Sequence, residues 1–168
     1  AKITSYALGS ESADITLTAT DRLELSGRGG DAARSGSAVQ SRNQGAGQAD
    51  GRAGDVIVRA GEVLLRDGAS LSVDTAGRAA AGNIDLQART LTLEGGSGLH
   101  SSSASTAALL EENGLVGAVP GQAGRIDVRA ESVRLSGAST IDVFAQEGPD
   151  AQGLAGGEPS PPGANEGN

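Results

Sequence analysis

The chain lacks several residue types on which compact proteins usually depend. Among its 168 residues there is no cysteine, methionine or tryptophan, and only one tyrosine and one phenylalanine, Tyr6 and Phe144. Without cysteine there can be no disulfide and no thiolate metal site. Large aromatic rings bury far more area than valine or leucine, so without them the core must be built from Val, Ile, Leu and Ala. Such a composition is typical of a narrow interior that is filled in layers.

Clustered basic residues and long apolar segments are also missing. The formal net charge is −8, and the 12 arginines and one lysine are scattered along the chain, whereas a nucleic-acid surface needs them grouped. No apolar run approaches the roughly 20 residues that cross a bilayer. The chain starts without Met, inside what reads as a repeat, and shows no secretion signal. We therefore expect a piece of a longer protein, with no nucleic-acid partner and no membrane span.

What the sequence has instead is repetition. One block occurs at 54–68, 82–96 and 124–138, and a fourth copy at 13–27 has one extra residue in its middle. Self-similarity of this kind indicates a solenoid. The step from position 54 to 82 is much shorter than the steps from 13 to 54 and from 82 to 124, which are nearly equal. Long and short units therefore alternate.

Inside each block, apolar and polar residues alternate. Ile84, Leu86 and Ala88 would face one way, and Asp85 and Gln87 the other. Period-two alternation in short runs rich in β-branched residues is typical of half-buried strands. A shift in its phase after Ala88, and a glycine further on, each predict a corner, so about 28 residues make one coil of a parallel β-helix with three short strands. The other inward-facing positions predicted in this way are Val56, Val58, Ala60, Val63, Leu65, Leu71, Val73, Leu91, Leu93, Leu99, Ser101, Ile126, Val128, Ala130, Val133, Leu135, Ile141 and Val143.

The repeats predict the domain organisation. Residues 1–145 should form an all-β solenoid of about four to five coils, and 146–168 a Gly/Pro-rich linker or disordered tail, because they lack the apolar surface that offsets the entropy of ordering. The extra residues of the long units fall at about 31–52 and 102–122. We expect both insertions to follow the third corner and to project as loops along one edge, the first as a mobile loop and the second with one or two helical turns. Binding by the solenoid, if it occurs, is predicted to lie on these loops.

At this point the repeats resemble a known family, the passenger repeats of filamentous-haemagglutinin-like exoproteins of two-partner secretion systems. One unit of that family reads approximately Gly-Asn-Ile-Thr-Ile-x-Ala, and later Asp-Gly-Ala-x-Ile-Ser-x-Ser-Thr. The matching segments are Gly82-Asn-Ile-Asp-Leu-Gln-Ala88, Leu65-Arg-Asp-Gly-Ala-Ser-Leu-Ser-Val-Asp-Thr75, Glu24-Leu-Ser-Gly27 and Ser97-Gly-Leu-His-Ser-Ser102. The similarity covers about residues 1–145.

The resemblance implies a right-handed β-helical rod, in line with the general right-handed preference of parallel crossovers. It further implies a protein exported through an outer-membrane secretion channel, then secreted or displayed at the bacterial cell surface. Adhesion to a host or bacterial receptor or glycan, aggregation, or presentation of a toxic domain are the usual roles. The amino-terminal secretion domain of that family and any effector domain are not in this chain, so the resemblance implies a scaffold and leaves its receptor unknown.

Two groups of residues are candidates for catalysis. His100 is the only histidine, and the sequence offers no Ser/His/Asp or Cys/His set to go with it. Asp85 and Asp127 occupy the same outward position in adjacent coils, where two carboxylates about 5 Å apart repel each other unless a cation intervenes. Arg59, Arg125 or Arg129 can supply that cation without any chemistry. We therefore predict no catalytic, cofactor-binding or metal-binding residue.

The sequence thus predicts a non-enzymatic structural or display rod, an adhesin segment of a large exoprotein. Two alternatives stay open. One is a β-helical passenger or fibre with polysaccharide-processing activity, which the near-absence of aromatic platforms disfavours. The other is an inert repeat spacer with no binding of its own.

Overall fold

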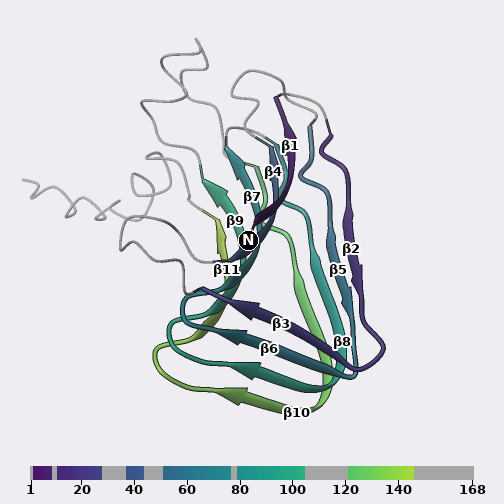
Figure 1. Ribbon diagram of the computed structural model, residues 1–168. Helices are drawn as coiled ribbons and strands as arrows, with labels where there is room; N and C mark the ends of the chain where they lie inside the picture. Colours follow the sequence, from purple (N-terminus) through teal and green to yellow (C-terminus); the bar gives the residue numbers. More distant parts are fainter. Residues whose placement is uncertain are drawn as a thin grey trace, which may run out of the picture.

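The structure is a computed structural model, and it describes residues 2–8, 11–27, 37–43, 51–76, 79–104 and 121–145. Within these ranges the chain is all-β, with eleven strands and no helix, so no described segment is a helix able to span a membrane. The strands are β1 (Lys2–Ala7), β2 (Ile15–Thr18), β3 (Arg22–Ser26), β4 (Ala38–Asn43), β5 (Val56–Arg59), β6 (Glu62–Arg66), β7 (Ser70–Ala76), β8 (Ile84–Leu93), β9 (Gly98–Ala104), β10 (Ile126–Leu135) and β11 (Thr140–Ala145). They are drawn in Figure 1.

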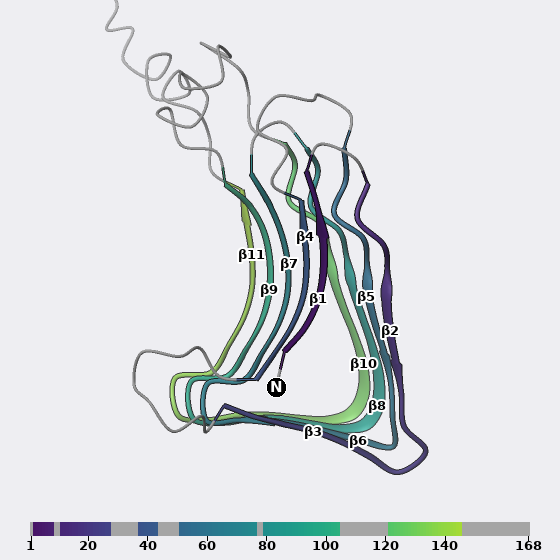
Figure 2. The same cartoon turned by 45° about the horizontal axis from the view of Figure 1, so that its top comes forward.

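All strand pairs are parallel, and they form two sheets. One sheet has five strands in the order β1-β4-β7-β9-β11. The other has six: five follow the order β2-β5-β8-β6-β3, and the sixth, β10, pairs with β8. The second sheet is strongly curled, because β8 pairs with β5 through its first half and with β6 through its second half. Seen from above, the five-stranded sheet and the two arms of the curled sheet enclose a narrow interior (Figure 2).

The alternation read from the sequence sets which side chains fill this interior. The predicted inward-facing residues of β5 to β9 are almost all without solvent exposure, and they pack in one cluster. The fully buried members are Val56, Val58, Val63, Leu65, Leu71, Val73, Ile84, Leu86, Leu91, Leu93 and Leu99. The prediction of a layered core of small aliphatic residues is confirmed for this part of the chain.

The repeated blocks lie directly over one another. Val56 pairs in register with Ile84, which pairs with Ile126 on its other side. In the fourth copy Ile15 pairs with Val56, and Arg22 with Glu62, so the difference in residue number between partners falls by one from the first pair to the second. The extra residue of that copy therefore lies between β2 and β3, where the chain turns a corner and the interior packing can tolerate it.

The corners into the five-stranded sheet use left-handed backbone. Asp67 and Gly68 have φ values of 57° and 77°, and Gly95 and Gly96 have 64° and 76°. Two consecutive residues with positive φ favour glycine and, next, aspartate or asparagine. The glycine predicted to mark this corner does so for a conformational reason.

One predicted loop is wrong in part. Residues 38–43, inside the segment 31–52 that we expected to be a mobile loop, form β4, which pairs with β1 and β7. The inward-facing residues of β4 are Val39, Ser41 and Asn43, all buried. Because two of the three are polar, the strand has no apolar alternation for the sequence to reveal.

β4 also changes where the extra residues lie. The first insertion is divided between the connection from β3 to β4 (27–37) and the connection from β4 to β5 (44–55), whereas the second connects β9 to β10 (105–125). Only the part of the first insertion that follows β4 lies at the same corner as the second insertion, between the five-stranded sheet and the curled sheet. Ser102, predicted to open the second one, belongs to β9. The helical turns predicted near 105–114, most of both loops and the predicted tail at 146–168 lie outside the described residues.

The last layer differs from those before it. Val133 and Leu135 of β10 are 47% and 45% exposed, although their register partners Leu91 and Leu93 are fully buried. Val143 of β11 is 51% exposed as well. Among the described residues nothing covers this face. The inward side of β10 and β11 is an open apolar end, which we call the open end.

Candidate functional site

The two carboxylates singled out from the sequence lie on neighbouring strands and are held by arginines. Asp85 on β8 and Asp127 on β10 are register partners. Arg129 Nη1 is 3.8 Å from Asp85 Oδ1, and Arg125 Nη2 is 2.5 Å from Asp127 Oδ2. The Gln87 amide also donates to Asp85 Oδ1, at 3.5 Å. As predicted, cations lie beside both carboxylates, so the pair forms a surface ion-pair network.

His100 is brought into a row that the linear sequence does not show. On the outward side of the five-stranded sheet it is in register with Ser72 of β7 and with Asp142 of β11. The three residue types are those of a nucleophilic triad, and His100 Nδ1 is 2.9 Å from Asp142 Oδ1. The third contact is not made. The Nε2 side of the ring lies over Gly98, where a Cβ would be 2.1 Å from Nε2, and the Ser72 hydroxyl donates to Asp74 Oδ2 at 3.0 Å.

The Ser72 hydroxyl is therefore bonded to Asp74 and not to His100, so the Ser–His contact of a nucleophilic triad is not formed. What the arrangement does is fix the imidazole of His100 on the sheet surface. Gly98 allows this because it has no side chain beneath the ring.

Asp74 is the centre of the polar contacts on this surface. Its Oδ1 accepts a hydrogen bond of 2.8 Å from the Ser102 hydroxyl, and its Oδ2 accepts the bond from Ser72. Arg42 Nη2 lies 3.7 Å from the same Oδ2. We call the outward side of β1, β4, β7, β9 and β11 the outer face. Its central groups are thus held in place by one another: Ser72 is buried, whereas Arg42, Ser102 and His100 are partly exposed.

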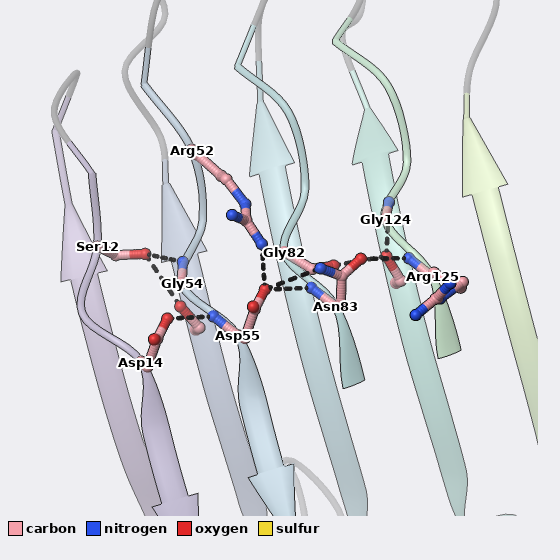
Figure 3. Close-up of polar contacts among 11 residues, drawn as sticks. Ser12, Asp14, Arg52, Gly54, Asp55, Gly82, Asn83, Gly124 and Arg125 are labelled. Carbon is pink, nitrogen blue, oxygen red and sulfur yellow. Dashed lines mark hydrogen bonds and ion pairs between the residues drawn. The ribbon is translucent and has the colours of Figure 1, made fainter. Parts of the chain in front are cut away.

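A second polar arrangement runs across the starts of the strands in the curled sheet (Figure 3). Asp14 Oδ1 accepts a hydrogen bond from the backbone N–H of Asp55 at 2.7 Å, and Asp55 Oδ1 accepts one from that of Asn83 at 2.7 Å. Asn83 Oδ1 in turn accepts from the N–H of Arg125 at 2.9 Å. The Arg52 guanidinium also donates to Asp55. Each side chain therefore accepts a hydrogen bond at the start of the strand in the next layer, and we call the row of Asp14, Asp55, Asn83 and Arg125 the ladder. The ladder stops at Arg125, because a guanidinium can only donate hydrogen bonds.

The residue before each ladder position is small for steric reasons. A Cβ on Gly82 would lie 2.3 Å from the carbonyl oxygen of Gly54, and one on Gly124 would lie 1.8 Å from that of Gly82. The Ser101 hydroxyl ties the same levels together, because it donates to the Gly82 carbonyl at 3.2 Å and accepts from the Gly124 N–H at 3.0 Å. Ala13 occupies the equivalent position in the first copy and is exposed. We call Gly54, Gly82 and Gly124 the glycine column. The glycine column and the ladder are structural, since they join one layer to the next.

The hollow beside the ladder is too small for a substrate, and the described residues hold no side-chain cluster suited to a metal ion. No group of three or more His, Asp or Glu side chains among them could hold a metal ion. A shallow hollow beside the ladder has a volume of about 60 Å³, well below the roughly 300 Å³ of small ligand sites. Its lining residues are Glu11, Ser12, Asp14, Arg52, Ala53 and Gly54. The outer face is therefore the best candidate for a functional surface.

Comparisons with models of protein families, with characterised proteins and with solved structures gave no match. The sequence reasoning found the Asp85 and Asp127 stack but missed the outer face. Its members, such as Arg42, Asp74 and His100, come from different copies, and the spacing between copies varies. Only the strand register places them in common rows.

Proposed function

We propose that this chain is a right-handed parallel β-helix that forms part of a secreted or cell-surface bacterial exoprotein. In this proposal its function is structural display, and it acts as a rod for adhesion or aggregation without enzymatic activity. The resemblance of the repeats to filamentous-haemagglutinin-like passengers supports this assignment, as do the parallel sheets and the in-register stacking of the copies.

The observation that carries the proposal is the open end. The register partners of Val133, Leu135 and Val143 in the preceding layer are buried, but these three side chains are about half exposed. A terminal layer of a repeat protein normally needs a polar cap to keep such a face out of water. A face of this kind suits contact with a further layer of the same geometry, as in a longer rod.

A non-catalytic role is supported by two contacts: the Ser72 hydroxyl bonds to Asp74 instead of His100, and Asp85 is paired with Arg129. Stability in such a stack comes from contacts between neighbouring layers, so length can grow by adding layers without a new core. A surface rod gains reach in this way. In this proposal the receptor contacts side chains on the outward sides of the two sheets or the connections between strands.

The experiment that tests the proposal is antibody labelling, with antibodies raised against this chain, of intact producer cells and of their culture medium. Signal on the cell surface or in the medium is the expected result. Signal that appears only after lysis would contradict export. A lysis marker measured in the same samples controls for leakage of cell contents.

A further inference from the structure

The two aromatic rings of the chain lie on the same face and in the same row. Tyr6 is 52% exposed and Phe144 is 54% exposed, and both point outward from the five-stranded sheet. The register runs from Tyr6 through Arg42, Asp74 and Ser102 to Phe144, one residue from each strand. Four strand spacings separate the ends of this row, which is roughly 19 Å. The fold thus places the only tyrosine and the only phenylalanine of the sequence at opposite ends of one polar track.

The surface between the rings is made of small or hydrogen-bonding side chains. Beside the row of Asp74 runs a second row with Thr4, Gln40, Ser72, His100 and Asp142. In Figure 2 the strands of this sheet bow toward the interior. A surface that carries hydroxyls, carboxylates and donors between two exposed aromatic rings matches the chemistry of a sugar chain. Pyranose rings present apolar C–H faces to aromatic rings and hydroxyls to polar groups.

The charges of the outer face favour a neutral ligand. Its outward-facing ionised side chains are Lys2, Arg42, Asp74 and Asp142, two of each sign. Arg42 is near Asp74, and the chain as a whole carries −8, so a polyanionic glycan gains no attraction here. A protein partner needs an apolar centre to its interface, whereas on this face the apolar groups stand at the two ends.

We propose that the outer face binds a neutral, linear oligosaccharide that lies across the strands, from Tyr6 at one end to Phe144 at the other. The two rings stack on sugar units, and Arg42, Asp74 and Ser102 hydrogen-bond to the hydroxyls between them. This inference rests on the proposed adhesive function and names the class of ligand that the rod recognises.

The test is titration calorimetry of the 168-residue chain with cellohexaose and with maltohexaose, two neutral linear hexasaccharides. Binding of at least one of them is expected. Aromatic contacts contribute about 0.5–1.5 kcal/mol beyond area burial, so Tyr6→Ala and Phe144→Ala should each weaken binding by roughly two- to tenfold. Leu64→Ala is the matched control, because Leu64 faces outward on β6, in the other sheet. Circular dichroism should show that all three variants keep the fold.

Three results would overturn the inference: no binding of either hexasaccharide by the wild-type chain, equal loss of binding in Leu64→Ala, or unchanged binding in both ring variants. Sedimentation of the same variants adds a further outcome. If loss of Tyr6 or Phe144 changes self-association and leaves sugar affinity unchanged, the rings serve contact between copies. Surface labelling of cells together with absent sugar binding would refute this inference and leave the proposed function standing.

Discussion

Replacing Gly82 with alanine tests whether the layers are as close as the glycine column requires. The new Cβ would lie 2.3 Å from the carbonyl oxygen of Gly54 and 2.6 Å from that of Ala53. An ordinary contact begins near 3.4 Å, so the two layers must separate locally by about 1 Å, which is the difference between 3.4 and 2.3. Both clashing atoms belong to backbone that is itself bonded into the stack, and neither can rotate away as a side chain could.

The cost of that separation follows from the contacts that bridge the same two layers. The backbone bond from Val56 N–H to the Asn83 carbonyl is 2.9 Å long, and that from Asn83 N–H to Asp55 Oδ1 is 2.7 Å. Lengthening each by about 1 Å takes it out of the bonding range. Overpacking costs about 1–3 kcal/mol and each lost bond about 1 kcal/mol, so we expect a loss of about 3–5 kcal/mol, a large share of a typical domain stability.

Urea unfolding followed by far-UV circular dichroism measures this loss, and hydrogen exchange shows whether it is centred on β5 and β8. Ala13→Gly is the matched control, since Ala13 occupies the same position in the first copy and is exposed; it should change stability by less than about 1 kcal/mol. If Gly82→Ala is as stable as the wild type, the close approach of the layers is wrong, and with it the explanation of the glycine column.

The remaining predictions concern the core, the ladder and the open end. Leu86→Asp places a charge at a fully buried position and should remove more than about 4 kcal/mol, whereas Asp85→Ala should change stability by about 0.5 kcal/mol or less; the reverse order in thermal unfolding would show that the inward and outward sides are misassigned. Asn83→Ala removes the acceptor for the Arg125 N–H and should cost about 1 kcal/mol, with faster exchange of that amide; unchanged exchange would mean that the ladder is not formed in solution. Val133→Asn, at the open end, should lower concentration-dependent association in sedimentation velocity while leaving the melting temperature nearly the same, and an unaltered sedimentation profile would argue against contact through this end.

Much of the fold was predictable because period-two alternation records which side of a strand is buried. The alternation places Val56, Leu65 and Leu86 on the inward sides of β5, β6 and β8, and all three side chains are fully buried. β4 was missed, because its inward residues Ser41 and Asn43 are polar. In this strand burial depends on hydrogen bonds, such as that between the Ser12 and Ser41 hydroxyls at 2.9 Å, and hydropathy does not register such bonds.

The candidate site was less accessible to sequence reasoning. A row such as that of Arg42, Asp74 and Ser102 joins positions whose numbers differ by 32 and 28, that is, 74 − 42 and 102 − 74. In the curled sheet, the three ladder bonds from β2 to β10 join positions whose numbers differ by 41, 28 and 42 in turn. Because the connections differ in length at two corners, the offset that applies to one sheet does not apply to the other. Only the observed register brings Tyr6 and Phe144 into one row.

The direction of the strand-to-strand hydrogen bonds has a mechanical consequence. The bonds between layers point along the stacking direction, so a force applied to the two ends of the stack of layers loads them one layer at a time, as in peeling. In the five-stranded sheet, Gly98 pairs with Ser70 on one side and with Thr140 on the other. The stretch of chain from Gly98 to Thr140 is half as long again as the stretch from Ser70 to Gly98. At roughly 3.4 Å per extended residue, release of the two layers lengthens the chain by about 95 Å and about 140 Å. A stack of layers built in this way yields in unequal steps, and it dissipates load while the layers behind the break stay folded.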